Sequence, residues 1–194
     1  MNKVQFRLKR QKNENLKIII EARSTSKRLK RKHLYKINGL SLIRILIKRL
    51  KKIKKVQGII LSTTNNPADD DLVNEAKKEK ILIFRGDEKN VLKRVIDTCE
   101  KYKLDSFCRI TGDNIIIDVD YVQLLIDNYL HNPNLDYISN SIYMPSGQGA
   151  AIVKFNALKK GIKYSFKNKY YKEFITSHIL ENQKKFKVFF LHHG

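Results

Sequence analysis

The sequence predicts an α/β fold in which a largely parallel β-sheet lies between two layers of helices. First, short apolar runs alternate with segments of helical period over most of the chain, as in successive strand–helix units. Second, the spacing of these units suits the crossovers that join parallel strands. A length of 194 residues is enough to bury a core, so we expect one domain.

Four apolar runs predict the parallel part of the sheet, at residues 16–22, 58–64, 81–84 and 106–110. After residue 131 the alternation of strands and helices breaks down. Three later runs, LDYISN, AAIVKF and FKVFFL, predict further strands. Because the strand–helix order is lost there, we expect these strands to add an antiparallel edge.

The segments between the strands have helical patterns. GLSLIRILIKRLKKIKK, which begins at Gly39, has an apolar stripe at helical spacing and lysines on the opposite face. Pro67 suits the first turn of the next helix, and the carboxylates of Asp69–Asp71 suit its positive end, which explains these acids better than a metal cluster. The other predicted helices cover residues 90–103, 118–131, 157–163 and 170–182.

The formal net charge of +21 usually indicates an anionic partner. Two explanations stay open: a general compositional bias toward lysine, or a functional basic surface. Lysine outnumbers arginine, which is the better reader of phosphates and bases. The chain has no helix-turn-helix, zinc-finger or aromatic RNA-binding motif, which argues against nucleic acid as the partner, although a basic nucleic-acid-binding module stays an alternative.

Cysteine content and hydropathy indicate a cytoplasmic protein. The only cysteines, Cys99 and Cys108, fit no zinc-binding pattern, and a chain of this size needs no disulfide. No apolar run approaches membrane-spanning length, and the N-terminus lacks the apolar centre of a secretory signal. We expect residues 1–15 to form a basic extension and residues 16–194 to form the single domain.

The loop after the first strand is a candidate phosphate-binding site, because ligands of open α/β sheets bind beyond the carboxyl ends of strands. It contains no P-loop or dinucleotide-binding fingerprint, and its first glycine is Gly39. Hydroxyls and cations must therefore act in place of glycine backbone, unless the loop is merely a basic surface. Its polar side chains are Arg23, Ser24, Thr25, Ser26, Lys27, Arg28 and Lys32.

The loop after the fourth strand carries a single carboxylate. In RITGDNIIID, Gly112 permits a tight turn and Asp113 follows a buried strand directly. A carboxylate in this place either holds Mg²⁺ together with phosphate oxygens or simply caps the turn.

Four segments together resemble the cytidylyltransferases of spore-coat polysaccharide biosynthesis, relatives of the CMP-sugar synthetases that activate sialic acid and ketodeoxyoctonate. These segments are IIIEARSTSKRLKRKHL, STTNNPADDDLV, IFRGDEKNVLKRV and RITGDNIIID. Weaker matches run from DYISN through GQGAAIVKFNAL and over KEFITSHILENQKKFKV. The matches follow the order of the family and cover most of residues 18–188.

The resemblance implies a Rossmann-like three-layer sandwich with a mixed, mostly parallel sheet, like that of the nucleotide-diphospho-sugar transferases. It also implies CTP, Mg²⁺, an acidic sugar and a homodimer. The sugar hydroxyl would attack the α-phosphorus of CTP, releasing pyrophosphate and a CMP-sugar for surface polysaccharide synthesis. Such a reaction needs in-line positioning and charge neutralisation rather than a covalent enzyme intermediate.

Residue types at the strand ends suit these tasks. We expect Arg23, Lys32 and Asp113 to be catalytic, with Asp113 also binding the metal. Thr63 and Thr64 would bind the base or ribose, and Arg109 has either a nucleotide-binding or a structural role. The full set expected to contact the nucleotide is Ala22, Arg23, Ser26, Arg28, Lys32, Thr63, Thr64, Arg85 and Arg109.

The chain departs from the family pattern at several positions. Thr25 stands where the family has glycine, and Gly149 and Ala151 stand where it tends to have an aspartate and a glutamate. The family also continues to a further metal-binding aspartate, so we expect this chain to lack the C-terminal end of the family's domain. Three hypotheses follow: a truncated or degenerate non-catalytic homologue, a protein that acts with a partner, or altered chemistry on a CTP-like ligand.

Overall fold

The computed structural model describes residues 14–25, 31–145 and 147–192. Seven strands form one sheet in the order β5–β4–β1–β6–β8–β7–β9. The parallel strands β5, β4, β1 and β6 form one half of the sheet. Their bounds are β1 Leu16–Glu21, β4 Ile59–Thr64, β5 Leu82–Gly86 and β6 Ser106–Thr111. The predicted α/β fold with a mostly parallel sheet is confirmed.

The second half of the sheet contains its antiparallel strand. The strands are β7 Tyr137–Ser139, β8 Ala151–Lys154 and β9 Val188–Phe190. β8 pairs antiparallel with both β6 and β7, whereas the outermost strand β9 pairs parallel with β7. The expectation of an antiparallel edge was therefore wrong: the reversed strand lies inside the sheet, because the chain passes β7 before returning between it and β6.

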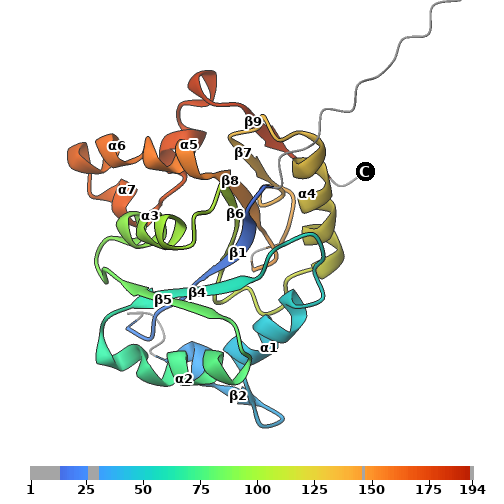
Figure 1. The fold of residues 1–194 in the computed structure, drawn as a ribbon, viewed down its shortest axis with the longest axis vertical. Helices are drawn as coiled ribbons and strands as arrows, with labels where there is room; N and C mark the ends of the chain where they lie inside the picture. Colours follow the sequence, from blue (N-terminus) through green and yellow to red (C-terminus); the bar gives the residue numbers. More distant parts are fainter. Residues whose placement is uncertain (1–13, 26–30, 146, 193–194) are drawn as a thin grey trace, which may run out of the picture.

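Helices cover both faces of the sheet, as Figure 1 shows. α1 Leu42–Leu50, α2 Asp70–Lys78 and α4 Val119–His131 pack on one face, and α3 Val91–Lys101 and α5 Phe155–Lys159 pack on the other. Along β1 the side chains alternate between the two cores: Ile18 and Ile20 face the first layer and Ile19 the second. Strands buried on both faces explain the unbroken apolar runs in the sequence.

The helices after β8 are shorter than predicted. The two expected stretches are divided into α5, α6 Ile162–Lys167, α7 Tyr170–Glu173 and α8 Ser177–Leu180, followed by the 3₁₀ helix η3 Gln183–Lys185. At the break after α5, a Cβ atom on Gly161 would approach the His178 ring to 2.6 Å, so the close packing of α8 against this turn requires glycine.

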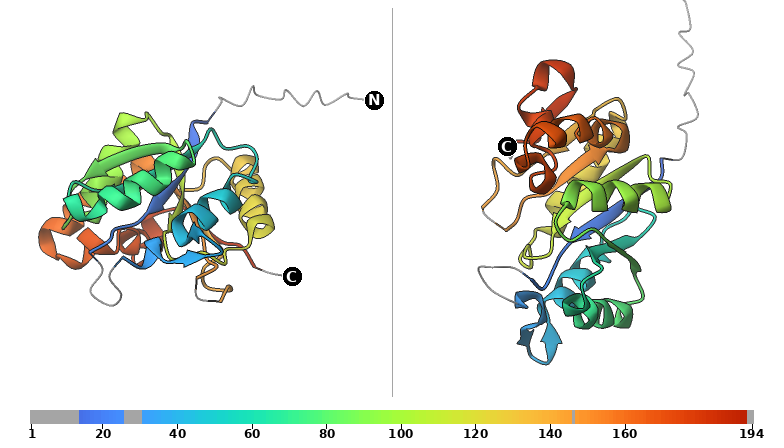
Figure 2. Two further views of the ribbon diagram at one scale, coloured as in Figure 1. Left: turned by 90° about the horizontal axis from the view of Figure 1, so that it is seen from below. Right: turned by 90° about the vertical axis from the view of Figure 1, so that its left-hand side faces the viewer.

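A small hairpin that was not predicted from the sequence is formed by β2 Lys36–Ile37 and β3 Leu40–Ser41. Its turn residues Asn38 and Gly39 both have positive φ, at 48° and 78°. Asn-Gly is a strong hairpin signal for this reason. Figures 1 and 2 show the hairpin projecting beside α1. It follows the 3₁₀ helix η1 Lys32–Leu34.

Both cysteines are free and buried, and burial raises the pKa of each thiol. Within the described part of the chain, no helix has the length and apolar character needed to cross a membrane.

Candidate active site

A cavity of about 610 Å³ lies beyond the carboxyl ends of β1 and β6, and we call it the strand-end cavity. Loops after these two strands form part of its wall, and residues around the start of α3 and the end of α7 form the rest. Ligands of open α/β sheets bind in this position. The predicted site residues that line it are Ala22, Arg23, Lys32, Arg109 and Asp113.

The loops after β1 and β6 meet at this cavity. The Lys32 Nζ atom lies 2.6 Å from Asp113 Oδ2, although the two residues are 81 positions apart. The Gly112 amide donates to the Glu21 carbonyl at 2.8 Å. A Cβ atom on Gly112 would lie 2.7 Å from the Ala22 Cβ atom, so only glycine allows this approach. The two loops predicted to bind the phosphates and the metal therefore converge at this cavity.

Asp113 is ionised at neutral pH. Burial alone would raise the pKa of its carboxyl group, but hydrogen bonds from Lys32 and Thr111 and the charge of Lys32 lower the pKa to about 2. Its side chain is 46% exposed, so it remains accessible to a ligand in the cavity. Asp113 and Lys32 thus present a carboxylate and an ammonium group side by side.

The donor set fits a metal ion only if the nucleotide supplies ligands too. Among the residues that the structure describes, no group of three or more His, Cys, Asp or Glu side chains could hold a metal ion. Mg²⁺ commonly binds proteins through one or two carboxylates together with substrate phosphates. The ionised, half-exposed carboxylate of Asp113 fits this mode of binding.

Glu21 and Arg109 form an ion pair on the wall of the strand-end cavity. Arg109 donates from Nε and Nη2 to the two carboxylate oxygens of Glu21, each at 2.9 Å. The Glu21 side chain is 7% exposed and the Arg109 side chain 25%. Burial favours the neutral form of Arg109, but the charge and hydrogen bonds of Glu21 outweigh this effect and raise the arginine pKa. Arg109 thus has a structural partner and also borders the cavity.

The start of the basic loop is tied to the loop that precedes α3. Arg23 Nη1 donates to the Glu88 carbonyl at 3.2 Å, and Thr25 Oγ1 donates to the Glu88 carboxylate at 2.9 Å. Asn66 Nδ2 donates to the other oxygen of that carboxylate at 3.0 Å. Arg23 also lies 3.5 Å from Glu173 at the end of α7. These contacts hold Arg23 at the edge of the cavity.

Thr63 and Thr64 do not line the strand-end cavity. Both are fully buried, and their hydroxyls donate to the same oxygen of Asp69, that of Thr63 at 2.9 Å. The Thr64 amide donates to this oxygen at 3.1 Å, and the Ser24 amide donates to the other oxygen at 2.6 Å. Asp69 therefore joins the basic loop to the end of β4. A direct contact of the two threonines with a base or ribose stays a prediction.

Asp69 has a role that helix capping does not describe, although Asp70 and Asp71 occupy the first turn of α2 as expected. Burial alone would raise the pKa of Asp69, but its hydrogen bonds hold the pKa below the usual value. A lowered pKa stabilises the folded protein at pH values above the unfolded-state pKa, near 3.8, and this stabilisation is lost as the pH falls through the folded-state pKa.

We expect Asp69→Asn to destabilise the protein by about 1–3 kcal/mol at pH 7, because the amide cannot accept all of these hydrogen bonds. The difference from wild type should shrink as the pH falls below the unfolded-state pKa of about 3.8, because the unfolded wild-type chain then binds a proton that the folded chain does not. Urea unfolding at pH 7 and pH 3 measures this. An equal difference at both pH values would contradict the charge assigned to Asp69.

Arg85, another predicted site residue, does not line the cavity. Arg85 binds the loop after β4 instead, donating to the Thr64 and Asn66 carbonyls at 2.8 Å each and to the Asp70 carboxylate at 2.6 Å. Ser26 and Arg28 lie outside the described residues.

Several residues that line the cavity were not predicted from the sequence, among them His33, Glu88, Arg94 and Phe174. His33 is buried, and its Nδ1 atom lies 3.1 Å from the Gly112 carbonyl oxygen, so it packs between the two loops. Burial and the neighbouring charge of Lys32 lower its pKa. Phe174 is 52% exposed and stacks on Tyr170 with a centroid distance of 4.5 Å. No local sequence pattern indicated that the end of α7 lies at this site.

A smaller cavity of about 250 Å³ adjoins the first one and shares Arg109 and Thr111 with it. Gly149 and Ala151, the positions without the expected carboxylates, line this smaller cavity. Ala151 pairs directly with Arg109 across β6 and β8. Asn114 connects the loop after β6 to this wall by donating from Nδ2 to the Gly149 carbonyl at 2.8 Å.

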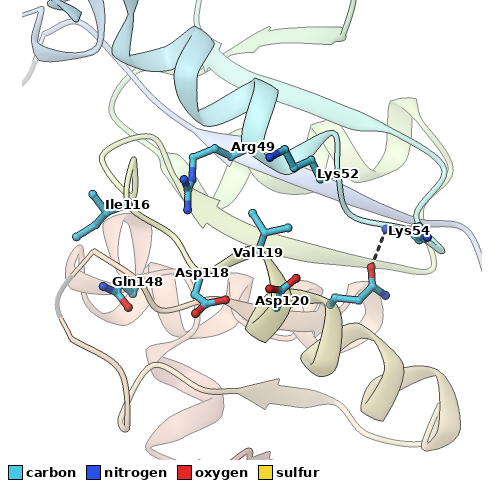
Figure 3. Close-up of a pocket in the computed structure, with 9 residues that line it drawn as sticks. Arg49, Lys52, Lys54, Ile116, Asp118, Val119, Asp120 and Gln148 are labelled. Atoms are coloured by element: carbon cyan, nitrogen blue, oxygen red, sulfur yellow. Dashed lines mark hydrogen bonds between the residues drawn. The ribbon is translucent and has the colours of Figure 1, made fainter.

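Another cavity, of about 600 Å³, lies between the end of α1 and the start of α4. Figure 3 shows Arg49 and Lys52 on the α1 side and Asp118 and Asp120 on the α4 side. Three cations, Arg49, Lys52 and Lys54, line this α1–α4 cavity together with the two carboxylates. The loop after β6 borders it through Ile116 and Asp118, whereas no described residue of the loop after β1 does.

Comparison with solved structures gives the same fold. A cytidylyltransferase from Leptospira borgpetersenii superposes with a TM-score of 0.88 at 27% identity, over 93% of this chain and 76% of the other. The structure of CMP:2-keto-3-deoxy-manno-octonic acid synthetase complexed with CTP superposes with a TM-score of 0.68 at 15% identity, over 93% of this chain and 90% of the other. At that identity the second likeness concerns the fold alone.

Sequence comparison identifies the family. An uncharacterized protein of Methanocaldococcus jannaschii is 39% identical over 173 residues, which are 89% of this chain and 70% of that protein. The spore coat polysaccharide biosynthesis protein SpsF of Bacillus subtilis is 28% identical over 178 residues, which cover 89% of this chain and 73% of SpsF. The profile of the cytidylyltransferase family matches residues 17–194. The chain therefore belongs to the cytidylyltransferase family.

Proposed function

We propose that this protein transfers the cytidylyl group of CTP to the hydroxyl of an acidic sugar for surface polysaccharide synthesis, with release of pyrophosphate. The observation that carries the proposal is the contact of Lys32 with Asp113 at 2.6 Å, which brings the loops after β1 and β6 together over one cavity. The relatedness to SpsF supports a sugar as the acceptor.

In the proposed mechanism, the triphosphate lies in the strand-end cavity beside Arg23 and Lys32. Their cations neutralise the charge on the transferred phosphoryl group and on the departing pyrophosphate. Asp113 would hold Mg²⁺ together with phosphate oxygens, and the metal, when bound, supplies further neutralisation of those oxygens. The Glu21–Arg109 pair fixes the wall between the two adjoining cavities.

The acceptor is assigned to the smaller adjoining cavity. Thr111 and Asn114 border it from the loop after β6, and Ser141 borders it from the segment after β7. These hydroxyl and amide groups suit the hydroxyls of a sugar. Because Arg109 and Thr111 line both cavities, a sugar in one and a triphosphate in the other would be neighbours, as direct attack on the α-phosphorus requires.

Measurement of pyrophosphate release tests the proposal. The protein is incubated with Mg²⁺, one nucleoside triphosphate and a panel of acidic and neutral sugars. We expect release that depends on CTP and on one class of acidic sugar, and CTP should raise the melting temperature. Absence of turnover together with absence of a CTP-dependent shift in melting temperature would contradict the proposal.

A non-catalytic relative is the second candidate, because Gly149 and Ala151 provide no carboxylates to the smaller cavity. Tight CTP binding without turnover on any acceptor would favour it. The alternative of a nucleic-acid-binding module has less support, because the Glu79 carboxylate lies within 3.7 Å of Arg44 and Lys48 on α1 and of Lys51 directly after it. Mg²⁺, a homodimer and a cytoplasmic location stay predictions.

A further inference from the structure

Arg94 is a buried cation at the strand-end cavity with no function assigned so far. It lies on α3, it is 2% exposed, and its side chain forms part of the cavity wall. Its Nη1 atom donates to the Asp87 carbonyl at 2.7 Å, but its Nε atom has no hydrogen-bond partner among the described residues. Arg94 takes part in none of the ion pairs found within the described ranges.

Three carboxylates, those of Glu21, Asp69 and Asp87, act on Arg94 through their charge, and each accepts hydrogen bonds from other groups. Both oxygens of Glu21 accept from Arg109, and both oxygens of Asp69 accept from the basic loop or the end of β4. Asp87 accepts from the Lys89 and Asn90 amides at 2.8 Å each through Oδ1. Burial lowers the pKa of Arg94, so the charged form is disfavoured in the free protein. A buried cation that lacks a paired carboxylate is costly to a fold.

The local structure makes room for this arginine. Gly86, at the end of β5, lies beside the side chain: a Cβ atom there would come within 3.1 Å of Arg94 Cγ and 2.7 Å of the Phe84 ring. The guanidinium is also held by the Asp87 carbonyl. These contacts fix the side chain in the wall of the cavity, which Lys32 and Asp113 also line.

We propose that Arg94 binds a phosphate group of the nucleotide, so that the ligand provides the anion that no residue in the described ranges supplies to this cation. The inference rests on the proposed function in that it names a contact of the same substrate. A phosphate is favoured over a carboxylate because Arg23, Lys32 and Lys89 line the same cavity and together suit a polyanion.

The test replaces Arg94 by methionine, which keeps the apolar stem and removes the charge. We expect Arg94→Met to melt at the wild-type temperature or higher without ligand, and to bind CTP and inorganic pyrophosphate at least about tenfold more weakly. Affinity for cytidine, which has no phosphate, should change less than twofold. Arg94→Lys keeps the charge but not the fork of donors, and should lie between the two proteins in its affinity for pyrophosphate.

Arg49 provides a matched control. It also donates to one carbonyl, that of Ile117 at 2.6 Å, and has a buried Nε atom without a partner among the described residues, but it borders the α1–α4 cavity. Arg49→Met should leave CTP and pyrophosphate affinities unchanged. The inference is overturned if Arg94→Met lowers the melting temperature while both affinities stay at wild-type values, or if the wild type binds neither ligand.

The ligands separate this inference from the proposed function. If the wild type binds pyrophosphate in a manner that depends on Arg94 but shows no preference for CTP, the phosphate-binding role stands and the CTP-dependent function fails. If CTP is turned over equally well by wild type and Arg94→Met, the function stands and the role of Arg94 fails.

Discussion

Asp113→Ala should weaken the binding of Mg²⁺·CTP by at least about 1 kcal/mol, the scale of a lost interaction with a charged group. The reason is that Asp113 is the ionised carboxylate on the loop after β6, with a pKa of about 2, at the edge of the strand-end cavity. In the absence of Mg²⁺, Asp113→Ala should instead strengthen CTP binding, because removing this carboxylate frees Lys32 for the phosphates and takes away a negative charge. Calorimetric titration of CTP with and without Mg²⁺ measures both effects.

The matched control for Asp113 is Asp120→Ala. Asp120 lies in the first turn of α4 and borders the α1–α4 cavity, so its removal should not change CTP affinity in either condition. If Asp113→Ala bound Mg²⁺·CTP as tightly as wild type, Asp113 would be a turn-capping residue rather than a metal ligand.

Glu21→Ala should reduce the free energy of unfolding by about 3 kcal/mol, because it leaves the Arg109 guanidinium without its carboxylate in a largely buried position. Replacing both residues together, as Glu21→Met with Arg109→Met, should recover most of this loss, since no buried charge then stays unpaired. Urea unfolding of the three variants and the wild type measures the coupling between the two residues.

The double variant also separates stability from function. Because Arg109 lines both cavities, we expect the variant with both Glu21→Met and Arg109→Met to be defective in cytidylyl transfer even though its stability is recovered. A loss below about 0.5 kcal/mol for Glu21→Ala would show that the ion pair is solvated and does not support the wall.

The general position of the site was predictable from the sequence, because topology determines it. Parallel strands place the residues after β1 and after β6 at one edge of the sheet, and strand polarity follows from the alternation of apolar runs and helices. Lys32 and Asp113 could therefore be assigned to one place without any knowledge of their contact. The order of the late strands was not predictable in this way, because the short runs around β7, β8 and β9 have no regular helices between them.

Side-chain partners at the site were not predictable, because they depend on contacts between distant segments. Thr63 and Thr64 carry the polar groups expected at a strand end, yet their hydroxyls bind Asp69. Glu21 was predicted only as part of the first strand, although its carboxylate forms an ion pair with Arg109 on a neighbouring strand. Arg94 belongs to an amphipathic helix, and helical periodicity does not reveal that a charged residue is buried with an unpaired guanidinium nitrogen.

The central claim is that the cavity between the loops after β1 and β6 receives the triphosphate. Crystallisation of the protein with CTP and Mg²⁺ tests it most directly. We expect electron density for the phosphates beside Arg23, Lys32 and Arg94, with Asp113 on the metal. Phosphate density in the α1–α4 cavity, with the strand-end cavity free of nucleotide, would contradict it.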